Sequence, residues 1–274
     1  SALVALAHIG LMKTGSTALQ SMFKRDSRIS SFVHNSCFYQ EKQDQEKKEL
    51  TFTSEYVVIS DENLSRKYNR VQSLEKSVEI IDGAMENVTF LFIIREQKSF
   101  LLSCYRHHIR QTRDGFRFNE WLCSPAGISQ VELCDFKGVD QRLRLATNSN
   151  LKFGLFEDLK SDPSHFVSWV YSLIGLESPK DYELHKENDR LKDHYYRKKL
   201  FLNRWSSSMS FIPSFCFYNK VVLKALDFIS LPEMDTWNDI DSENSSVMMR
   251  KFKIANNFLT TQYSLELKKH GYAL

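Results

Sequence analysis

The segment that most constrains the fold of this chain is a strand-like run that leads directly into a glycine-containing turn and a helix start. Residues 3–9 are apolar, the turn holds Lys13 and Gly15, and Ser16 and Thr17 open a segment with helical apolar spacing. A helix N-terminus presents main-chain N–H groups that lack partners, and its dipole favours negative charge. The ammonium group of Lys13 adds a positive charge beside them. The segment therefore predicts a cradle for a phosphate or a group that resembles one.

The position of the lysine separates this turn from the common nucleotide-triphosphate loop. That loop reads G-x-x-x-x-G-K-[ST], with the lysine directly after the second glycine. Here Gly10 and Gly15 have the required separation, but Ser16 follows Gly15 and Lys13 precedes it by two residues. The sequence M-K-T-G-S-T instead resembles the 5′-phosphosulfate loop of sulfotransferases that use 3′-phosphoadenosine-5′-phosphosulfate (PAPS), with Met12 where many members have proline. For this motif alone, an ordinary strand–helix turn with a solvated lysine is the alternative.

A second motif begins at the apolar, β-branched run 88–94, which is typical of a strand buried on both faces. The run ends at Arg95, and Ser103 follows eight residues later in helical sequence. In PAPS sulfotransferases an arginine and a serine at this spacing hold the donor's 3′-phosphate, and I-I-R-E-Q-K-S-F-L-L-S-C-Y resembles that motif. A guanidinium can bind a phosphate through two hydrogen bonds, and a hydroxyl can add another. Taken singly, the two residues could be a solvated arginine at a strand end and a serine bonded within its helix.

The resemblance implies a set of donor-binding residues. Main-chain N–H groups of Thr14, Gly15, Ser16 and Thr17, with the hydroxyls of Ser16 and Thr17, would hold the 5′-phosphate. Lys13 would stabilise the charge that develops on the leaving oxygen during in-line transfer of the sulfuryl group to an acceptor hydroxyl or amine. PAPS is then the co-substrate. No metal is expected, because the transferred group carries less charge than a γ-phosphate.

An acceptor hydroxyl also requires a general base. The cytosolic branch of the family has a histidine just after the strand that corresponds to residues 56–60, whereas this chain has Glu62 there. Several carbohydrate and bacterial members use glutamate as the base, so Glu62 is the first choice, with His34 and Glu41 in reserve. The alternative is that Asp61 and Glu62 only satisfy the N-terminus of a following helix.

Further segments resemble carbohydrate sulfotransferases. The strand-like run 153–159 (FGLFEDL) precedes an apolar helical segment that closes near Gly175, a pattern whose role in the family is mostly structural. Together with glutamate in place of histidine, this pattern makes the chain resemble bacterial enzymes that act on surface polysaccharides or glycolipids. The expected acceptor is therefore a carbohydrate or glycolipid. Residues 186–190 could reach over the donor or form a polar helix start. Residues 211–231 could line an acceptor groove, make peripheral contact with a membrane or, as the default for such a run, pack as a core helix.

These segments predict an α/β fold, a three-layer P-loop-like parallel sheet flanked by helices, with a helical C-terminal cap. The chain is expected to form a single sulfotransferase domain, 1–274, with an α/β donor-binding core at 1–160 and a mainly helical part at 161–274. Lys13, Glu62 and Arg95 should meet at the carboxyl ends of the strands. The expected strands are 3–9, 56–60, 88–94 and 151–156, and the expected helices include 163–174, 189–205, 216–229 and 245–269.

Composition is compatible with one globular domain and excludes several classes of protein. The chain has 274 residues, 42% of them hydrophobic, and no repeat or low-complexity linker, so it can bury one large core. The net charge is only +3, from 37 basic and 34 acidic residues, and no nucleic-acid-binding motif is present. The basic residues at positions 106–113 could make the donor pocket electropositive or form an exposed helix face.

The cysteines and histidines indicate neither a disulfide scaffold nor a metal site. The five cysteines show no C-x-x-C spacing and the eight histidines no H-x-x-x-H pair. Cys104 is expected to be a small buried residue, and a single bridge such as Cys123–Cys134 stays open. No apolar stretch approaches the ~20 residues of a membrane span, and no signal peptide is visible. A cytoplasmic protein is the simplest expectation; a Golgi-lumenal domain that has lost an upstream anchor is the alternative.

Two other functions compete with sulfuryl transfer. Residues 59–62 could be the magnesium-binding acidic strand of a P-loop kinase or ATPase, although the displaced Lys13 and the pair Arg95 and Ser103 argue against it. The third possibility is a nucleotide-binding protein without catalytic activity.

Overall fold

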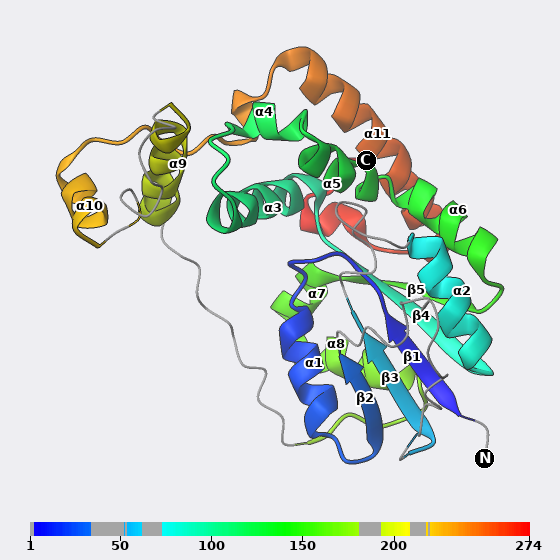
Figure 1. Ribbon diagram of the computed structural model, residues 1–274. Coiled ribbons are helices and arrows are strands. Elements are labelled where there is room, and N and C mark those ends of the chain that lie inside the picture. The colour runs from blue at the N-terminus through cyan, green and yellow to red at the C-terminus, as the bar shows by residue number, and fades with distance from the viewer. Residues whose placement is uncertain are drawn as a thin grey trace, which may run out of the picture. The chain divides into compact units, whose positions relative to one another are not determined.

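The computed structural model of the chain describes residues 3–33, 52, 54–61, 73–180, 193–208, 218 and 220–274. Its contacts define two compact units, each assembled from separated segments (Figure 1). Unit 1 comprises Ser1–Glu96, Leu133–Lys186 and Lys251–Leu274, and unit 2 comprises Gln97–Glu132 and Glu187–Arg250. The division of a single domain at residue 160 stays a prediction.

The described strands of unit 1 form one parallel sheet in the order β2-β3-β1-β4-β5. All four expected strands are confirmed to within one residue at each end. Their apolar runs fit this position, because a strand covered on both faces has no polar side. The fifth strand, β2, was not predicted. The strands are β1 (Val4–His8), β2 (Ile29–Val33), β3 (Tyr56–Ser60), β4 (Asn87–Ile94) and β5 (Asn150–Leu155).

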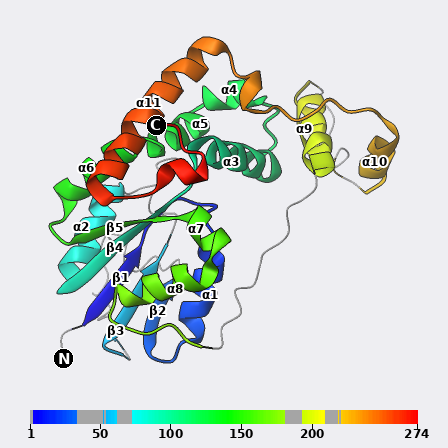
Figure 2. The same cartoon turned by 180° about the vertical axis from the view of Figure 1, so that it is seen from behind.

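Helices cover both faces of the sheet (Figures 1 and 2). On one face, α1 (Ser16–Arg25) and α8 (Pro163–Ser172) share a buried cluster with alternate residues of the strands. On the other face, Phe153 of β5 packs edge-on against Tyr263 at the end of α11 (Ser242–Tyr263), with ring centroids 4.7 Å apart. There α2 (Leu74–Ala84) and α6 (Phe136–Ala146) are joined by an ion pair between Glu75 and Arg142. The predicted three-layer α/β fold is therefore confirmed.

The strand order places a change of direction at β1. Chain connections run from β1 to β2 and β3 on one side, and then cross to β4 and β5 on the other. In open parallel sheets, ligands bind at the carboxyl ends of the strands, where the strand order reverses. In this sheet that point lies between β1 and β4, and the two strands are followed by the two predicted phosphate motifs.

Unit 2 is helical in its described residues. An aromatic cluster joins α3 (Gln97–Gln111) to α4 (Phe118–Leu122), and the rings of Tyr105, Phe118 and Trp121 lie 5.2–6.1 Å apart. The other helices of this unit are α5 (Pro125–Leu133), whose last residue belongs to unit 1, α9 (Asp193–Ser208), α10 (Lys220–Ala225) and the part of α11 up to Arg250, with 3-10 turns at Leu226–Phe228 and Trp237–Asp239. Among the described helices of the chain, none is long and apolar enough to span a membrane.

Helix α11 ends before the predicted boundary at 269. Ser264 has a left-handed conformation, with φ of 53°, which a continuing helix cannot contain. A short 3-10 helix, η6 (Leu267–His270), follows and ends at Gly271, whose φ is 79°. The segment 264–274 therefore turns back against α7 (Phe156–Ser161) of unit 1 instead of extending the helix (Figure 2).

Candidate functional site

The turn between β1 and α1 is attached directly to β4. The main-chain N–H of Leu11 donates to the carbonyl oxygen of Ile93 at 2.9 Å. A Cβ atom on Gly10 would lie 2.3 Å from the main-chain nitrogen of Ile93, so only glycine permits this approach. The start of the turn is thus fixed against the strand that ends at Arg95.

Two residues of the turn have left-handed conformations, Lys13 with φ of 62° and Gly15 with φ of 74°. For a residue with a side chain this conformation costs roughly 1–2 kcal/mol, so its surroundings must impose it on Lys13. Thr14, between them, is buried, and its hydroxyl donates to the carbonyl oxygen of Leu11 at 2.6 Å. Left-handed residues in a turn bring successive N–H groups to one side, which makes a concavity suited to an anion.

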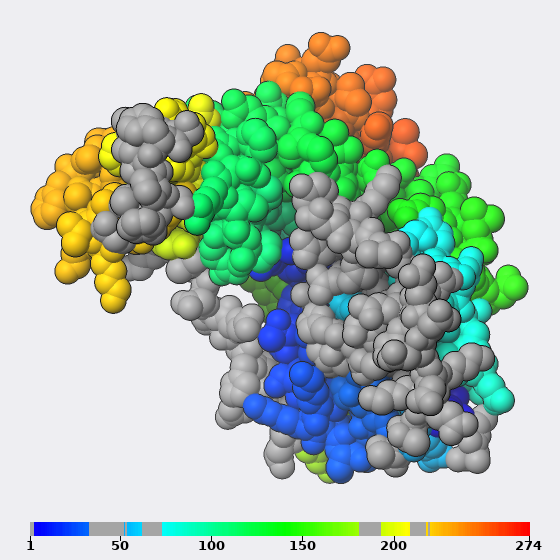
Figure 3. Space-filling model, viewed as in Figure 1, coloured from blue at the N-terminus to red at the C-terminus, as the bar shows by residue number. Residues whose placement is uncertain are grey.

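Helix α1 follows this turn without a capping side chain from the described residues. Gly15 is the N-cap residue, the first turn contains no acidic residue, and the Ala18 N–H bonds to the Gly15 carbonyl at 3.1 Å. Uncapped N–H groups and the positive end of the helix dipole favour an anion here. Ser16 is buried and Thr17 is exposed, on a helix that reaches the surface in Figure 3 (blue). The residues present therefore fit a phosphate group at this helix start.

Arg95 directly follows β4 and lies beside the turn. Its Nη1 atom donates to the carbonyl oxygen of Lys13 at 3.2 Å. Its guanidinium carbon lies 5.0 Å from the centroid of the Phe156 ring at the start of α7 (Phe156–Ser161). Stacking on an aromatic face leaves the N–H groups of an arginine directed outward in the plane of the guanidinium. Arg95 and the turn that holds Lys13 therefore meet at the carboxyl edge of β1 and β4.

Of the remaining predicted site residues, only Ser103 is among the described residues. Ser103 is half-buried in α3 and belongs to unit 2. Glu62, His34 and Glu41 lie outside the described residues, as do 186–190. Asp61, the residue before Glu62, is buried, and its N–H donates to the carbonyl oxygen of His8 at 3.0 Å. The roles of Glu62 and Ser103 therefore stay predictions.

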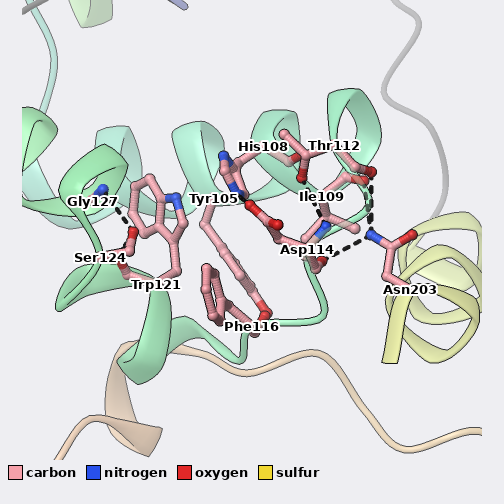
Figure 4. A network of polar contacts seen from close by, with 10 residues as sticks. All are labelled: Tyr105, His108, Ile109, Thr112, Asp114, Phe116, Trp121, Ser124, Gly127 and Asn203. Carbon is pink, nitrogen blue, oxygen red and sulfur yellow. Dashed lines mark hydrogen bonds and ion pairs between the residues drawn. The ribbon is translucent and has the colours of Figure 1, made fainter. Parts of the chain in front are cut away.

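The helix that carries Ser103 is fixed at its C-terminal end by a polar network (Figure 4). The side-chain amide of Asn203 in α9 is fully buried and donates to the carbonyl oxygen of Asp114 at 2.9 Å, with longer bonds to those of Ile109 and Thr112. The Tyr105 hydroxyl donates to the Phe116 carbonyl at 2.8 Å. The bond to Ile109 satisfies a carbonyl group that the helix end leaves without a partner, and the other bonds hold the residues that follow the helix. Within unit 2, α3 is thus held by α9 and by the turn that follows it.

The basic residues after Ser103 are partly paired within unit 2. Arg106 forms an ion pair with Asp193 at 2.8 Å, and the ring of His108 contacts Asp114 at the same distance. These carboxylates offset part of the positive charge that the sequence suggests for this helix. An effect of the run on the donor pocket stays a prediction.

A buried polar group beneath the turn was not predicted from the sequence. His8, the last residue of β1, is fully buried, and its Nδ1 lies 2.8 Å from the hydroxyl of Ser60, which also accepts from Gln20 Nε2 at 3.2 Å. Within the described part of the chain, His8 Nε2 makes no hydrogen bond. Burial lowers the pKa of His8 to about 4, so the ring is neutral near pH 7. The signal in the sequence was a histidine that ends an otherwise apolar strand.

The described cysteines and acidic residues give no sign of a metal site or disulfide. The described cysteines, Cys104, Cys123 and Cys134, are not joined in disulfides, and Cys104 is buried as expected. Across the described ranges, no group of three or more His, Cys, Asp or Glu residues could hold a metal ion.

The strand order and the turn after β1 define a P-loop-like α/β protein, and solved structures identify its fold as that of sulfotransferases. A sulfotransferase from Alicyclobacillus acidocaldarius is 12% identical, with 82% of this chain and 100% of that chain covered at a TM-score of 0.52. The sulfotransferase domain from the curacin biosynthetic pathway is 12% identical, with 97% and 99% covered and a TM-score of 0.48. Mouse sulfotransferase SULT7A1 complexed with PAP is 11% identical, with 98% and 88% covered and a TM-score of 0.41.

At these identities the likeness is one of fold. Comparisons of the sequence with protein-family models and with curated proteins gave no match.

Proposed function

We propose that this protein is a PAPS-dependent sulfotransferase. It transfers a sulfuryl group to a hydroxyl or amine of an acceptor, which we propose to be a carbohydrate or a glycolipid. The acceptor class comes from the sequence resemblance, and the fold is compatible with it.

One observation supports the proposal more than any other: the guanidinium of Arg95 contacts the main chain of Lys13. The sequence resemblance assigns these residues to the two phosphate groups of one donor. Pairing of β1 with β4 brings these residues, 82 positions apart, to one point, as a donor that spans both motifs requires. Their position at the reversal of strand order is also where a nucleotide is expected in such a sheet.

The residues then divide the work of transfer. PAPS supplies an activated sulfuryl group on a bridging oxygen of its 5′-phosphosulfate. N–H groups from Thr14 to Thr17 bind the 5′-phosphate, and Arg95 with Ser103 binds the 3′-phosphate. Lys13 stabilises the charge left on the bridging oxygen as the S–O bond breaks. The left-handed backbone conformation of Lys13 is already present without a donor. The turn therefore loses less conformational entropy when the donor binds.

Glu62 is proposed as the base that accepts the proton of the acceptor hydroxyl while the new S–O bond forms. Its neighbour Asp61 is hydrogen bonded to the end of β1, five residues before Lys13. No step of this scheme needs a divalent metal, because Lys13 and the main-chain N–H groups offset the charge of the transferred group.

The run 211–231 is the segment that could contact the acceptor. In the run 211–231, Leu226 and Leu231 are buried with Leu202, whereas Val221 and Phe228 are 75% and 91% exposed. The default expectation of a core helix therefore holds for only part of the run. Exposed apolar side chains beside the lysines of α10 suit peripheral contact with a membrane surface that carries a glycolipid, and we include this contact and a cytoplasmic location in the proposal.

Thermal shift separates the candidate functions. We expect 3′-phosphoadenosine-5′-phosphate (PAP) to raise the melting temperature without metal, and ATP with magnesium to have little effect. Radiolabelled PAPS with a panel of polysaccharide and glycolipid acceptors then tests turnover. Stabilisation by ATP and magnesium alone would overturn the proposal. PAP binding without turnover on any acceptor would favour a non-catalytic nucleotide-binding protein.

One observation favours the P-loop kinase or ATPase as the second candidate. Asp61 is buried at the end of β3, the strand next to β1, where an acidic residue could bind a magnesium ion of a nucleotide triphosphate. Lys13 argues against it, because it lies within the turn and not at the helix start that contacts the terminal phosphates.

A further inference from the structure

The first turn of α7 supports both donor-binding motifs. The ring of Phe156 lies beneath the Arg95 guanidinium, 5.0 Å from centroid to carbon. A Cβ atom on Gly15 would lie 2.8 Å from Leu159 Cδ2 and 3.4 Å from the Phe156 ring, so this turn also packs against the phosphate turn. A shift of α7 would therefore displace both motifs together.

The next residue, Glu157, is hydrogen bonded to the main-chain peptide group that joins Arg95 to Glu96. Its Oε1 atom accepts from the main-chain N–H of Glu96 at 2.9 Å. Its Oε2 atom accepts from the hydroxyl of Tyr272 at 3.0 Å. Each carboxylate oxygen thus has its own donor, and the N–H that directly follows Arg95 is held in place by a charge-assisted bond.

Tyr272 is itself held by the chain around it. Its side chain is only 4% exposed, and the hydroxyl is protonated at every working pH because burial and the charge of Glu157 raise its pKa. The carbonyl oxygen of the next residue, Ala273, accepts from the buried amide of Asn256 in α11 at 2.8 Å. His270 contacts Asp158, the neighbour of Glu157, at 2.8 Å. The segment 264–274 is therefore fixed to α7 at two adjacent carboxylates (Figure 2).

We propose that Glu157 and Tyr272 are positioning residues for the donor's 3′-phosphate, an inference that rests on the proposed function. Glu157 fixes the Arg95–Glu96 peptide, and Tyr272 orients the carboxylate that does so. Neither residue acts on the reacting atoms, because both Glu157 oxygens are engaged as acceptors. The segment after α11 thereby supports the donor site, although none of its residues contacts the donor in this proposal.

The test compares donor affinity in matched variants. Y272F removes one donor to Glu157 and should weaken PAP binding by about five- to tenfold in calorimetry. The matched control is Y263F, because Tyr263 is a half-buried tyrosine of unit 1 whose hydroxyl likewise donates to a carboxylate, that of Asp140. Y263F should lower the melting temperature by a similar amount and change PAP affinity by less than about twofold.

Two substitutions of Glu157 test whether a conservative variant restores PAP affinity. E157A removes both acceptors and should weaken PAP binding at least as much as Y272F. E157Q can still accept from the Glu96 N–H through its carbonyl and can donate its amide to the Tyr272 oxygen, so most of the affinity should return. In turnover assays the KM for PAPS should rise in E157A and Y272F, while kcat at saturating donor stays within about twofold.

A readout without ligand separates this inference from the proposed function. Hydrogen exchange of the Glu96 amide should be slow in the wild type and about tenfold faster or more in E157A. If R95A loses PAP binding while Y272F and E157A bind PAP like the wild type, the inference is overturned and the proposed function stands. If the wild type does not bind PAP, both fail, even where exchange at Glu96 responds to E157A.

Discussion

The Nη1 atom of Arg95 donates a hydrogen bond to the main-chain oxygen of Lys13 at 3.2 Å, joining the ends of two neighbouring parallel strands. Because this hydrogen bond reaches the main chain of Lys13, it does not depend on the conformation of the Lys13 side chain. In the proposed reaction, a change in position of the Lys13 ammonium group would therefore leave Arg95 in place. In the proposed reaction this separates a residue that binds from a residue that stabilises charge, and the two should differ in their kinetic effects.

Replacing Lys13 by alanine should lower kcat by about 100-fold or more, because charge on the leaving oxygen loses its main stabilising group. Arg95→Ala should instead raise the KM for PAPS, with a smaller effect on kcat. Steady-state kinetics with PAPS as the varied substrate distinguishes the two outcomes.

Lys24→Ala is the matched control for Lys13→Ala, because Lys24 is an exposed lysine in the last turn of α1, the helix that follows Lys13. It should change neither constant. Equal losses of activity in the Lys13 and Lys24 variants would show that general charge, and not the turn, accounts for the effect.

Replacing Gly10 by alanine should destabilise the protein by about 3 kcal/mol, since the new Cβ would overlap the backbone of β4. Chemical denaturation of Gly10→Ala and of Gly83→Ala provides the comparison. An alanine at position 83, in α2, would meet nothing within 4 Å and should stabilise by up to about 1 kcal/mol. A Gly10→Ala protein as stable as the wild type would mean that the turn does not lie against β4.

The apolar strands were predictable because periodicity and length are local properties of the sequence. Residues 88–94, for example, form a continuous apolar and β-branched run, and β4 spans Asn87–Ile94. Strand β2 was missed because Ser30 and Ser31 interrupt its apolar pattern, and its position at the sheet edge depends on pairing with β3. The end of α11 was placed too late because the left-handed Ser264 has no distinctive sequence signal.

The site was predictable only where the chemistry lies in one continuous segment. Lys13 and Arg95 stand in motifs whose order and spacing carry the information, and the parallel sheet brings them together. The support from Glu157 and Tyr272 could not be foreseen, because it joins residues 115 positions apart by one hydrogen bond. His8 was overlooked for a related reason: its partner Ser60 ends a different strand and lies 52 positions away in the sequence.

Replacing Glu62 by glutamine should abolish sulfuryl transfer while PAP affinity stays within about threefold of the wild type, because the base acts on the acceptor and not on the donor. Calorimetry with PAP and a turnover assay measure the two effects separately. His34→Gln and Glu41→Gln serve as comparison variants, since these residues are the alternative bases. Retained turnover in Glu62→Gln together with a loss in either of the other two would reassign the base.

The buried His8 should make the stability of the protein depend on pH. Its pKa is about 4 in the folded protein and about 6.5 when unfolded, so the unfolded state binds more protons between these values. Stability from the neutral ring is therefore fully present above about pH 6.5 and is lost as pH falls towards 4. The loss amounts to about 3 kcal/mol across this window.

His8→Asn tests this dependence, because an amide can keep the hydrogen bond to Ser60 but does not titrate. The difference in unfolding free energy between wild type and variant should change by about 3 kcal/mol between pH 6.5 and 4. Hydrogen bonds from arginines lower the pKa of Asp26 and Glu75, and these carboxyls also lose stabilisation in acid, but they do so equally in both proteins. His165→Gln, at an exposed histidine, should retain the wild-type slope. A constant difference between wild type and His8→Asn across this range would mean that the ring is charged or solvated in the folded protein.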